Sequence, residues 1–328
     1  MVFNDVEKTL LLTGVLVLVI TLSIGALMML TQPESPSGES GVRFLDQIEA
    51  REFLRADVDG YVRHLTAADL HARHVGTRAE YTSVIVKSAT DFSQEEQRRI
   101  RALCRVVDTR IGEKGAAAAA AAAAAAIESF APEPDSGSDY ESDDEEMMPV
   151  DTANDVFLEH YSGADESSEN ENESESALPL PPKQWHLDAE ALEKLPWVFA
   201  KTTGSAYEDG LPHTRAPNII FLSARTLASR DKALAKTLLH EKIHVYQRAY
   251  PDKAATAIAG AGYAKTGRLR RDVPLIRANP DLDEWIYADP SGRDMALVYS
   301  REAPHSIGDV TGGSGEHPYE VMAYEWEL

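Results

Sequence analysis

Two histidines and a glutamate stand together in the run His240-Glu241-Lys242-Ile243-His244, which has the HExxH spacing. On a helix, residues four apart lie on one face, so both imidazoles can reach the same ion. Glu241 would then flank that ion and could accept a proton from a water molecule that the ion activates. The spacing therefore predicts a zinc site with hydrolytic chemistry.

The residues around the motif predict a long helix from Asp231 to Arg248 that lies between apolar neighbours. Its two flanks are apolar, and Pro251 is placed to end it. The short β-branched and aromatic run Asn218–Leu222 predicts a strand just before this helix. Because Pro217 has no N–H to give to a neighbouring strand, we expect this strand at the edge of the sheet, where an extended peptide could pair with it.

A catalytic zinc needs a third protein ligand and an open position for water. The metzincin pattern is excluded, because Gln247 and Tyr250 occupy the positions where it requires glycine and histidine. A helix is predicted over 316–326 with Pro318 at its first position, which would place Glu320 in the first turn. The residues left open as third ligand are His305, Glu316, His317 and Glu320.

Four stretches of the sequence carry a resemblance to known proteins: Pro212-His213-Thr214, His240–Gln247, Arg277-Ala278-Asn279-Pro280-Asp281 and His317-Pro318-Tyr319-Glu320. The chain resembles the gluzincin zinc metallopeptidases, in which a second helix supplies a glutamate ligand. It looks still more like HExxH proteins of large double-stranded DNA viruses. The resemblance implies that His240, His244 and Glu320 are the metal ligands, with His317 in reserve, and that Glu241 is the general base. Tyr324 stands where many gluzincins have an acidic residue that orients a ligand histidine.

Peptide hydrolysis also needs a hydrogen-bond donor for the oxyanion that forms during the reaction. The sequence does not rank the candidates, and for each of them a structural role in the core or at the rim is the stronger expectation. The candidate donors are Tyr319, Tyr324, Tyr299, His305 and His213. The polar residues predicted to fix a turn and a salt bridge are Arg277, Asn279, Asp281 and Asp283.

The N-terminal segment 9–31 is free of charged residues and long enough to span a bilayer as a helix. We expect an uncleaved anchor, because a cleaved signal peptide would have a shorter apolar run that ends in small residues. The protein is therefore predicted to be a single-pass membrane protein, of a virion or host membrane if viral. The sequence leaves open which side of the membrane holds the rest of the chain.

Composition divides the remaining chain into three parts. Residues 42–112 predict a small helical module, in which Cys104 lies on an apolar face as a buried structural thiol. Residues 113–183, with an alanine tract followed by an acidic segment, predict a spacer and a disordered linker. Residues 184–328 predict the zincin-like domain.

The net charge of −22 comes mainly from the linker, where 18 acidic residues lie between Glu128 and Glu175. Without them the net charge is −4, so the folded parts are nearly balanced. No basic patch is large enough for a nucleic-acid-binding surface, and nucleic acid is not expected as a partner. The acidic linker could dock on a partner, for example through its apolar patch Val156-Phe157-Leu158.

Together these observations predict an α+β protein with a small sheet, an HExxH helix and a C-terminal ligand helix. Its expected function is that of a membrane-anchored zinc metallopeptidase acting on peptides or proteins, with Zn²⁺ as cofactor. The alternative is an inactive structural or interaction protein, of a virus particle if viral, that keeps the zinc site for folding. An intact Glu241 favours the enzyme, because a structural zinc site needs no base.

Overall fold

A computed structural model describes residues 41–129, 185–311 and 315–326. Of these, 41–116 and 185–326 belong to one compact unit, and 117–129 belong to a second. The acidic segment that begins at Glu128 lies outside the described residues, except for Glu128 and Ser129. Its apolar patch at Val156-Phe157-Leu158 also lies outside them. The first unit holds all the residues that the sequence singles out for chemistry.

The central sheet of the first unit has the strand order β1-β3-β5-β4, with β2 paired to β3. β1 and β5 run parallel to β3, whereas β2 is antiparallel to β3 and β4 is antiparallel to β5. Smaller sheets have the orders β6-β7-β8 and β10-β9. The strands are β1 (Val42–Phe44), β2 (Ala89–Thr90), β3 (Trp197–Thr202), β4 (His213–Arg215), β5 (Ile219–Ser223), β6 (Ala264–Leu269), β7 (Trp285–Ala288), β8 (Asp294–Met295), β9 (Val298–Tyr299) and β10 (Val310–Thr311).

The strand predicted at Asn218–Leu222 forms as β5, but its predicted edge position is wrong. β5 lies between β3 and β4, and all five of its residues are buried. The reason is that its side chains are apolar on both faces, as in strands covered by helices on both sides. Pro217 precedes the strand and removes no N–H from its ladder. At this end of the sheet the edge strand is β4, which begins at His213.

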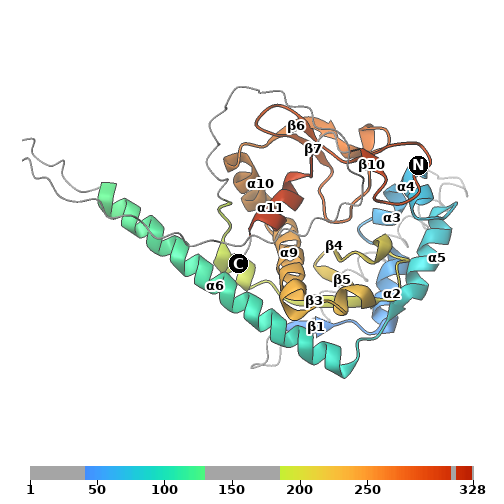
Figure 1. The fold of residues 1–328 in the computed structure, drawn as a ribbon, viewed down its shortest axis with the longest axis horizontal. Helices are drawn as coiled ribbons and strands as arrows, with labels where there is room; N and C mark the ends of the chain where they lie inside the picture. The colour runs from blue at the N-terminus through green and yellow to red at the C-terminus, as the bar shows by residue number, and fades with distance from the viewer. Residues whose placement is uncertain (1–40, 130–184, 312–314, 327–328) are drawn as a thin grey trace, which may run out of the picture. The chain divides into compact units, whose positions relative to one another are not determined.

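Helices cover both faces of this sheet. Figure 1 shows α9 on one side of β3 and β5, with α2 and α5 on the other. The helices of the described residues are α2 (Gln47–Ala56), α3 (Tyr61–His64), α4 (Ala67–Ala72), α5 (Arg78–Ser88), α6 (Gln94–Ser129), α7 (Ala189–Glu193), α8 (Ala224–Leu227), α9 (Asp231–Ala249), α10 (Pro251–Gly260) and α11 (Pro318–Glu325), with 3₁₀ turns at Glu208–Gly210 and Arg270–Asp272.

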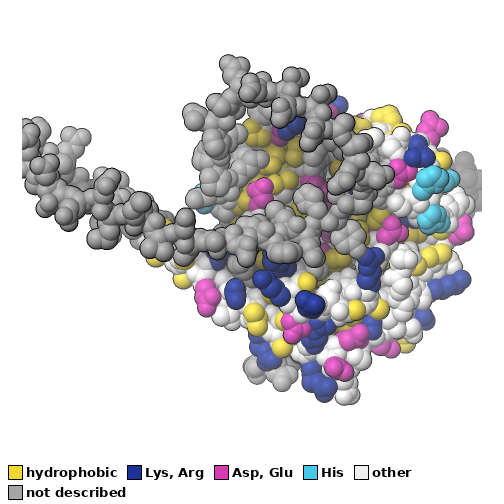
Figure 2. Space-filling view, in the orientation of Figure 1, with side chains coloured by type: hydrophobic (Ala, Val, Ile, Leu, Met, Phe, Trp, Pro, Cys, Tyr) yellow, Lys and Arg dark blue, Asp and Glu magenta, His cyan; other side chains and the backbone are white. Residues whose placement is uncertain are grey.

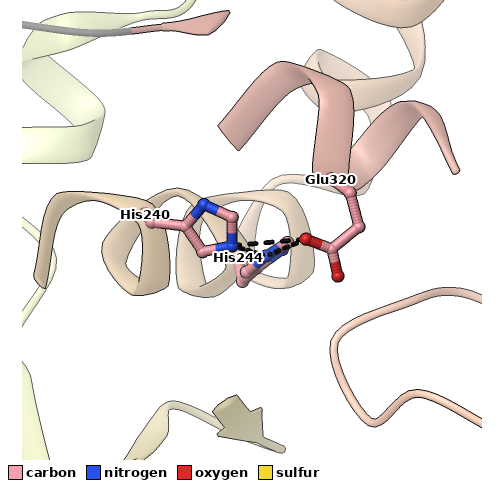
Figure 3. A group of neighbouring side chains, drawn as sticks. All are labelled: His240, His244 and Glu320. Carbon is pink, nitrogen blue, oxygen red and sulfur yellow. Dashed lines mark hydrogen bonds and ion pairs between the residues drawn. The ribbon is translucent and has the colours of Figure 1, made fainter. Parts of the chain in front are cut away.

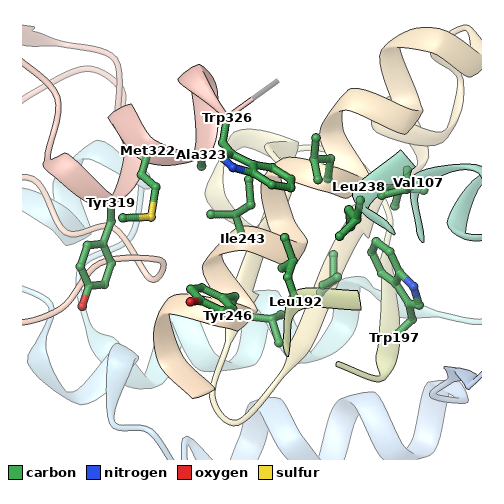
Figure 4. Close-up of a cluster of buried hydrophobic side chains, with 14 of the residues drawn as sticks. Val107, Leu192, Trp197, Leu238, Ile243, Tyr246, Tyr319, Met322, Ala323 and Trp326 are labelled. Atoms are coloured by element: carbon green, nitrogen blue, oxygen red, sulfur yellow. The ribbon is translucent and has the colours of Figure 1, made fainter. Parts of the chain in front are cut away.

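The side chains of each strand point alternately to the two faces of the sheet, and this produces a hydrophobic core on each face. Trp197 and Phe199 of β3 belong to the cluster beneath α9, whereas Ala200 belongs to the cluster beneath α2 and α5. In the same way Ile220 faces α9 and Phe221 faces the opposite side, as the two-residue period of a strand requires. Figure 4 shows the first cluster, in which side chains of α6, α7, α9, α11 and β3 interlock.

Two helices of the first unit begin with a capping box. The Ser93 backbone N–H donates to Glu96, and the Glu96 N–H donates to the Ser93 hydroxyl, just ahead of α6. Thr66 and Asp69 make the same reciprocal pair at α4. Helix α6 continues through the alanine tract, and Cys104 on its buried face is inaccessible to solvent. Burial raises the pKa of the Cys104 thiol, as expected of a structural cysteine.

The expected separation of a helical module at 42–112 from a domain at 184–328 differs from the structure. Strands β1 and β2 of the first segment pair with β3 of the second. Buried ion pairs also join the segments: Arg73 contacts Glu208 at 2.6 Å, and Arg215 contacts Asp57 at 2.9 Å. The sheet could not be anticipated from helical periodicity, because β1 and β2 are only three and two residues long. The two segments fold as one unit.

Among the described residues, no helix is both long and apolar enough to cross a membrane. The segment 9–31, for which the sequence predicts a transmembrane helix, lies outside those residues. The structure therefore gives no support to the predicted single-pass membrane protein.

Candidate metal centre

Helix α9 carries both histidines of the HExxH run. Leu234, Leu238 and Ile243 anchor it in the core, and each is fully buried. This packing fixes the rotation of the helix and leaves His240 and His244 on the face opposite the core. Their Nε2 atoms lie 3.0 Å apart, the arrangement expected of ligands one helical turn apart.

Glu320 reaches the same point from α11, as the resemblance implies. His317 caps this helix by accepting a hydrogen bond from the Tyr319 N–H, and Pro318 occupies its first position. Glu320 Oε2 lies 3.2 Å from His240 Nε2 and 3.5 Å from His244 Nε2 (Figure 3). The three side chains together could hold a metal ion.

The distances within this group fit a small divalent ion. Two ligand atoms that each lie about 2.1 Å from a tetrahedral ion are about 3.4 Å apart. The three observed separations, 3.0, 3.2 and 3.5 Å, lie close to that value. Three ligands of a tetrahedral ion leave one position open for water or substrate.

Gln247 orients His244. The Gln247 side-chain amide donates to the Tyr319 carbonyl oxygen at 2.9 Å, so its own oxygen faces His244 Nδ1 at 2.8 Å. Nδ1 therefore carries a proton, and Nε2 is the nitrogen that can bind a metal once it has lost its own proton. Such partners fix the tautomer and the ring orientation of a metal ligand.

Asn279 performs the same task for Glu320. Its side-chain amide donates to Glu320 Oε1 at 2.6 Å, which leaves Oε2 to face the histidines. Asn279 in turn accepts a hydrogen bond from the Asp281 backbone N–H. The segment expected to fix a turn does so, and it also holds a candidate ligand in place.

Glu241 lies beside this group with unused hydrogen-bonding capacity. The residue is 1% exposed, and its Oε2 has no hydrogen-bond partner among the described residues. Burial raises the pKa of Glu241 well above its ordinary value, and the Asp281 carboxylate raises it further. A buried carboxyl group of this kind is suited to exchange a proton near neutral pH.

The charges of the group also shift the pKa values of His244 and Glu320. Burial lowers the pKa of His244, but the Glu320 and Asp281 carboxylates raise it by more, to about 10. Burial raises the pKa of Glu320, but the charge on His244 and hydrogen bonding with His240 hold it well below its ordinary value. Because a coordinating nitrogen must be unprotonated, a metal that binds here displaces a proton.

A cleft with a volume of about 700 Å³ runs past the group. His240, Glu241 and Glu320 line it, between the residues that lead into β4 and the loop 277–281. In Figure 2, basic and acidic side chains are interspersed over the described part of one face of the molecule.

The edge strand β4 is not free to pair with a peptide along its length. The Thr214 backbone N–H of β4 donates to Asp281 Oδ1 at 2.5 Å, and its hydroxyl donates to the same oxygen at 2.8 Å. Pro212, two residues earlier, has no N–H. An extended peptide pairing with β4 would therefore meet a backbone N–H, that of Thr214, which already donates to Asp281. The peptide pairing expected from the sequence at Asn218–Leu222 is blocked at this point of the edge.

The other candidates for the third ligand lie apart from the group or serve it differently. His317 Nδ1 caps α11, and its Nε2 faces the Trp285 carbonyl oxygen at 3.3 Å and Asp283 at 3.4 Å. His305 is exposed and contacts Arg301. Glu316 lines the cleft, where burial raises its pKa and Glu320 raises it further.

Of the candidate oxyanion donors, two line the cleft. Tyr324 is 59% exposed, and its ring centroid lies 4.5 Å from that of His240. His213 also lines the cleft, but its Nδ1 donates to the Leu211 carbonyl oxygen at 3.0 Å, and burial lowers its pKa. Its Nε2 is thus unprotonated and cannot donate. Tyr299 belongs to a buried network with Arg73 and Asp69, and Tyr319 packs against His317 and Tyr287.

Sequence reasoning missed the orienting roles of Gln247 and Asn279. A signal existed for Gln247, because a residue three positions after a ligand histidine lies on the same face of the helix. No signal existed for Asn279, which acts on a residue 41 positions away.

Comparisons with family models, with curated proteins and with solved structures returned no match.

Proposed function

We propose that this chain is a zinc-dependent hydrolase that cleaves peptide bonds. Two neutral imidazoles and one carboxylate form a ligand set that zinc uses in hydrolytic sites, and carboxylate-rich oxygen sites suit magnesium or calcium better. The ligand set His240, His244 and Glu320 on two helices is also that of the gluzincin peptidases that the sequence resembles. This likeness and the ligand chemistry support zinc over other divalent ions.

The observation that carries the proposal is the unpartnered Glu241 Oε2 beside the metal-binding group. A buried carboxylate without a hydrogen bond costs free energy in a folded protein. An unpartnered carboxylate beside a metal-binding group therefore indicates a functional role, and the role available to Glu241 is to accept a proton. Peptide hydrolysis supplies that use, because a water molecule must lose a proton and the leaving amine must gain one.

In the proposed reaction, Glu241 accepts the proton of the attacking water and later delivers it to the leaving nitrogen. Zinc, when bound, activates the water and polarises the substrate carbonyl. Gln247 and Asn279 hold two ligand side chains in position throughout. The Tyr324 hydroxyl, in the cleft beside His240, is the candidate donor for the developing negative charge on the carbonyl oxygen.

The alternative is a structural or interaction protein whose zinc site serves only folding. A structural site closes its coordination with four protein ligands. Among the described residues, the group that could hold a metal has three. This difference favours the hydrolase, together with the unused carboxylate of Glu241.

The test uses the full chain and two measurements. Metal analysis should find about one zinc per chain, lost in His240→Ala and retained in His305→Ala, whose histidine is exposed and away from the group. A quenched-fluorescence peptide library should be cleaved by the wild-type chain and not by Glu241→Gln, which should still bind zinc. Glu302→Gln, at an exposed position, serves as the control. Unchanged turnover in Glu241→Gln would exclude the proposed mechanism.

A further inference from the structure

The cleft continues from the metal centre to a space between α6 and α9. There its walls are apolar: Val106 and Val107 come from α6, and Ala235 and Leu239 come from α9. Val106 is 50% exposed, although most large apolar side chains of the described residues are covered. Leu211 and Tyr324, at 52% and 59% exposure, line the same cleft. Exposed apolar groups gathered in one cleft indicate a binding surface.

The same end of the cleft carries positive charge that nothing in the described residues neutralises. Arg110 of α6 and Lys232 of α9 are exposed and line the cleft. Neither makes an ion pair or a side-chain hydrogen bond with a residue that the structure describes. Asp231 is the acidic residue at this end, and it is bound to Arg99 at 2.7 Å. The cations remain available to a ligand of opposite charge.

We propose that this end of the cleft is a subsite for a polypeptide segment in which an apolar side chain is followed by acidic ones. The apolar side chain lies against Val106 and Leu239, and the acidic side chains reach Arg110 and Lys232. Charge complementarity selects an acidic partner over a neutral one. The inference rests on the proposed function in one respect, because it takes this segment to be part of the substrate of the metal centre.

Binding is measured apart from catalysis, on the full chain carrying Glu241→Gln. The probe is a short fluorescein-labelled peptide in which one leucine is followed by a run of glutamates, read by fluorescence anisotropy. Replacing the glutamates by lysines should abolish binding, and replacing the leucine by serine should weaken it. Added salt should weaken binding of the acidic peptide, because both cations are exposed.

Charge reversal within the same background locates the subsite. Arg110→Glu and Lys232→Glu should each weaken binding by about fivefold to tenfold, the effect of losing one exposed ion pair and adding repulsion. Arg105→Glu is the matched control, since Arg105 is also exposed on α6 but does not line the cleft. For the apolar wall, Val106→Ser is compared with Ile48→Ser, which is 66% exposed and outside the cleft.

Equal losses in Arg110→Glu and Arg105→Glu would overturn the inference, as would equal affinity for the acidic and basic peptides. Stronger competition by a polynucleotide than by the acidic peptide would also overturn it. A cleavage assay on the wild-type chain separates the two proposals. Binding that follows the charge pattern without any cleavage would reject the hydrolase and keep the subsite. Cleavage without preference for the acidic peptide would keep the hydrolase and reject the subsite.

Discussion

The side chain of Asn279 donates a 2.6 Å hydrogen bond to Glu320 Oε1, so that the other carboxylate oxygen faces His240 and His244. Asn279 comes from a loop and Glu320 from the first turn of α11. The bond fixes the one ligand of the proposed zinc site that the HExxH run does not supply.

Asn279→Ala should weaken zinc binding by about 10-fold to 100-fold, the usual effect of removing a partner that orients a metal ligand. Asn279→Asp should weaken it as well, because it replaces the donor by a second carboxylate next to Glu320. Zinc affinity is measured by competition with a chromophoric chelator. Unchanged affinity in both variants would show that Glu320 does not need this bond, or is not a ligand.

Gln247→Leu should weaken zinc binding by a similar factor, because His244 Nδ1 loses the acceptor that sets its tautomer. Gln247→Glu keeps an acceptor for Nδ1 and should bind zinc more tightly than Gln247→Leu. The same chelator competition gives both values. If the two variants bound zinc equally well, the Gln247–His244 hydrogen bond would have no part in metal binding.

Removal of the metal should lower the melting temperature, because zinc would join α9 to α11 in the folded state only. A ligand at about a thousand times its dissociation constant adds about 4 kcal/mol to the free energy of unfolding. Thermal unfolding with added zinc is compared with unfolding in chelator. The difference should vanish in His240→Ala and persist in His305→Ala; a melting temperature independent of zinc would contradict a bound metal.

The buried pair of Arg73 and Glu208 should make stability fall in acid. Burial raises the pKa of Glu208, but Arg73 lowers it by more, to about 2, against an ordinary value of 4.5. The pair therefore stabilises the fold fully above about pH 4.5, and this contribution, on the order of 3 kcal/mol, is lost as pH falls from 4.5 toward 2.

Glu208→Gln should destabilise the protein by about 3 kcal/mol at neutral pH, because the buried Arg73 charge loses its 2.6 Å partner and keeps only Asp69, at 3.6 Å. The difference from wild type should shrink below about pH 4.5, as the wild-type glutamate becomes protonated. Urea unfolding at several pH values measures both effects. Glu52→Gln, at an exposed position, should show neither. A difference that does not depend on pH would contradict the assigned ionisation.

The fragment 184–328 alone should not fold cooperatively. It would lack β1 and β2, which pair with β3, and the α6 side chains Ile100, Cys104 and Val107, which are fully buried in the shared core. A chain that joins 41–116 directly to 185–328 should unfold in one transition, as seen by circular dichroism and tryptophan fluorescence. A stable, cooperatively folded 184–328 fragment would contradict the single unit.

The sequence by itself determined the helices and helix ends that depend on residues close together in the chain. The HExxH spacing and its apolar flanks specify α9, and Pro318 specifies the start of α11 with Glu320 in its first turn. The capping residues Ser93 and Thr66 mark two further helix starts. These features depend on residues within one or two turns of each other, and so they can be inferred without a fold.

The tertiary structure alone decided which strand forms the edge, which residues orient the ligands and where one folding unit ends. β4 rather than β5 is the edge, because pairing order depends on strands far apart in the chain. Asn279 meets Glu320, and β1 meets β3, only when distant segments pack together. Such contacts are selected by the burial of apolar side chains over the whole unit, which no local pattern in the sequence expresses.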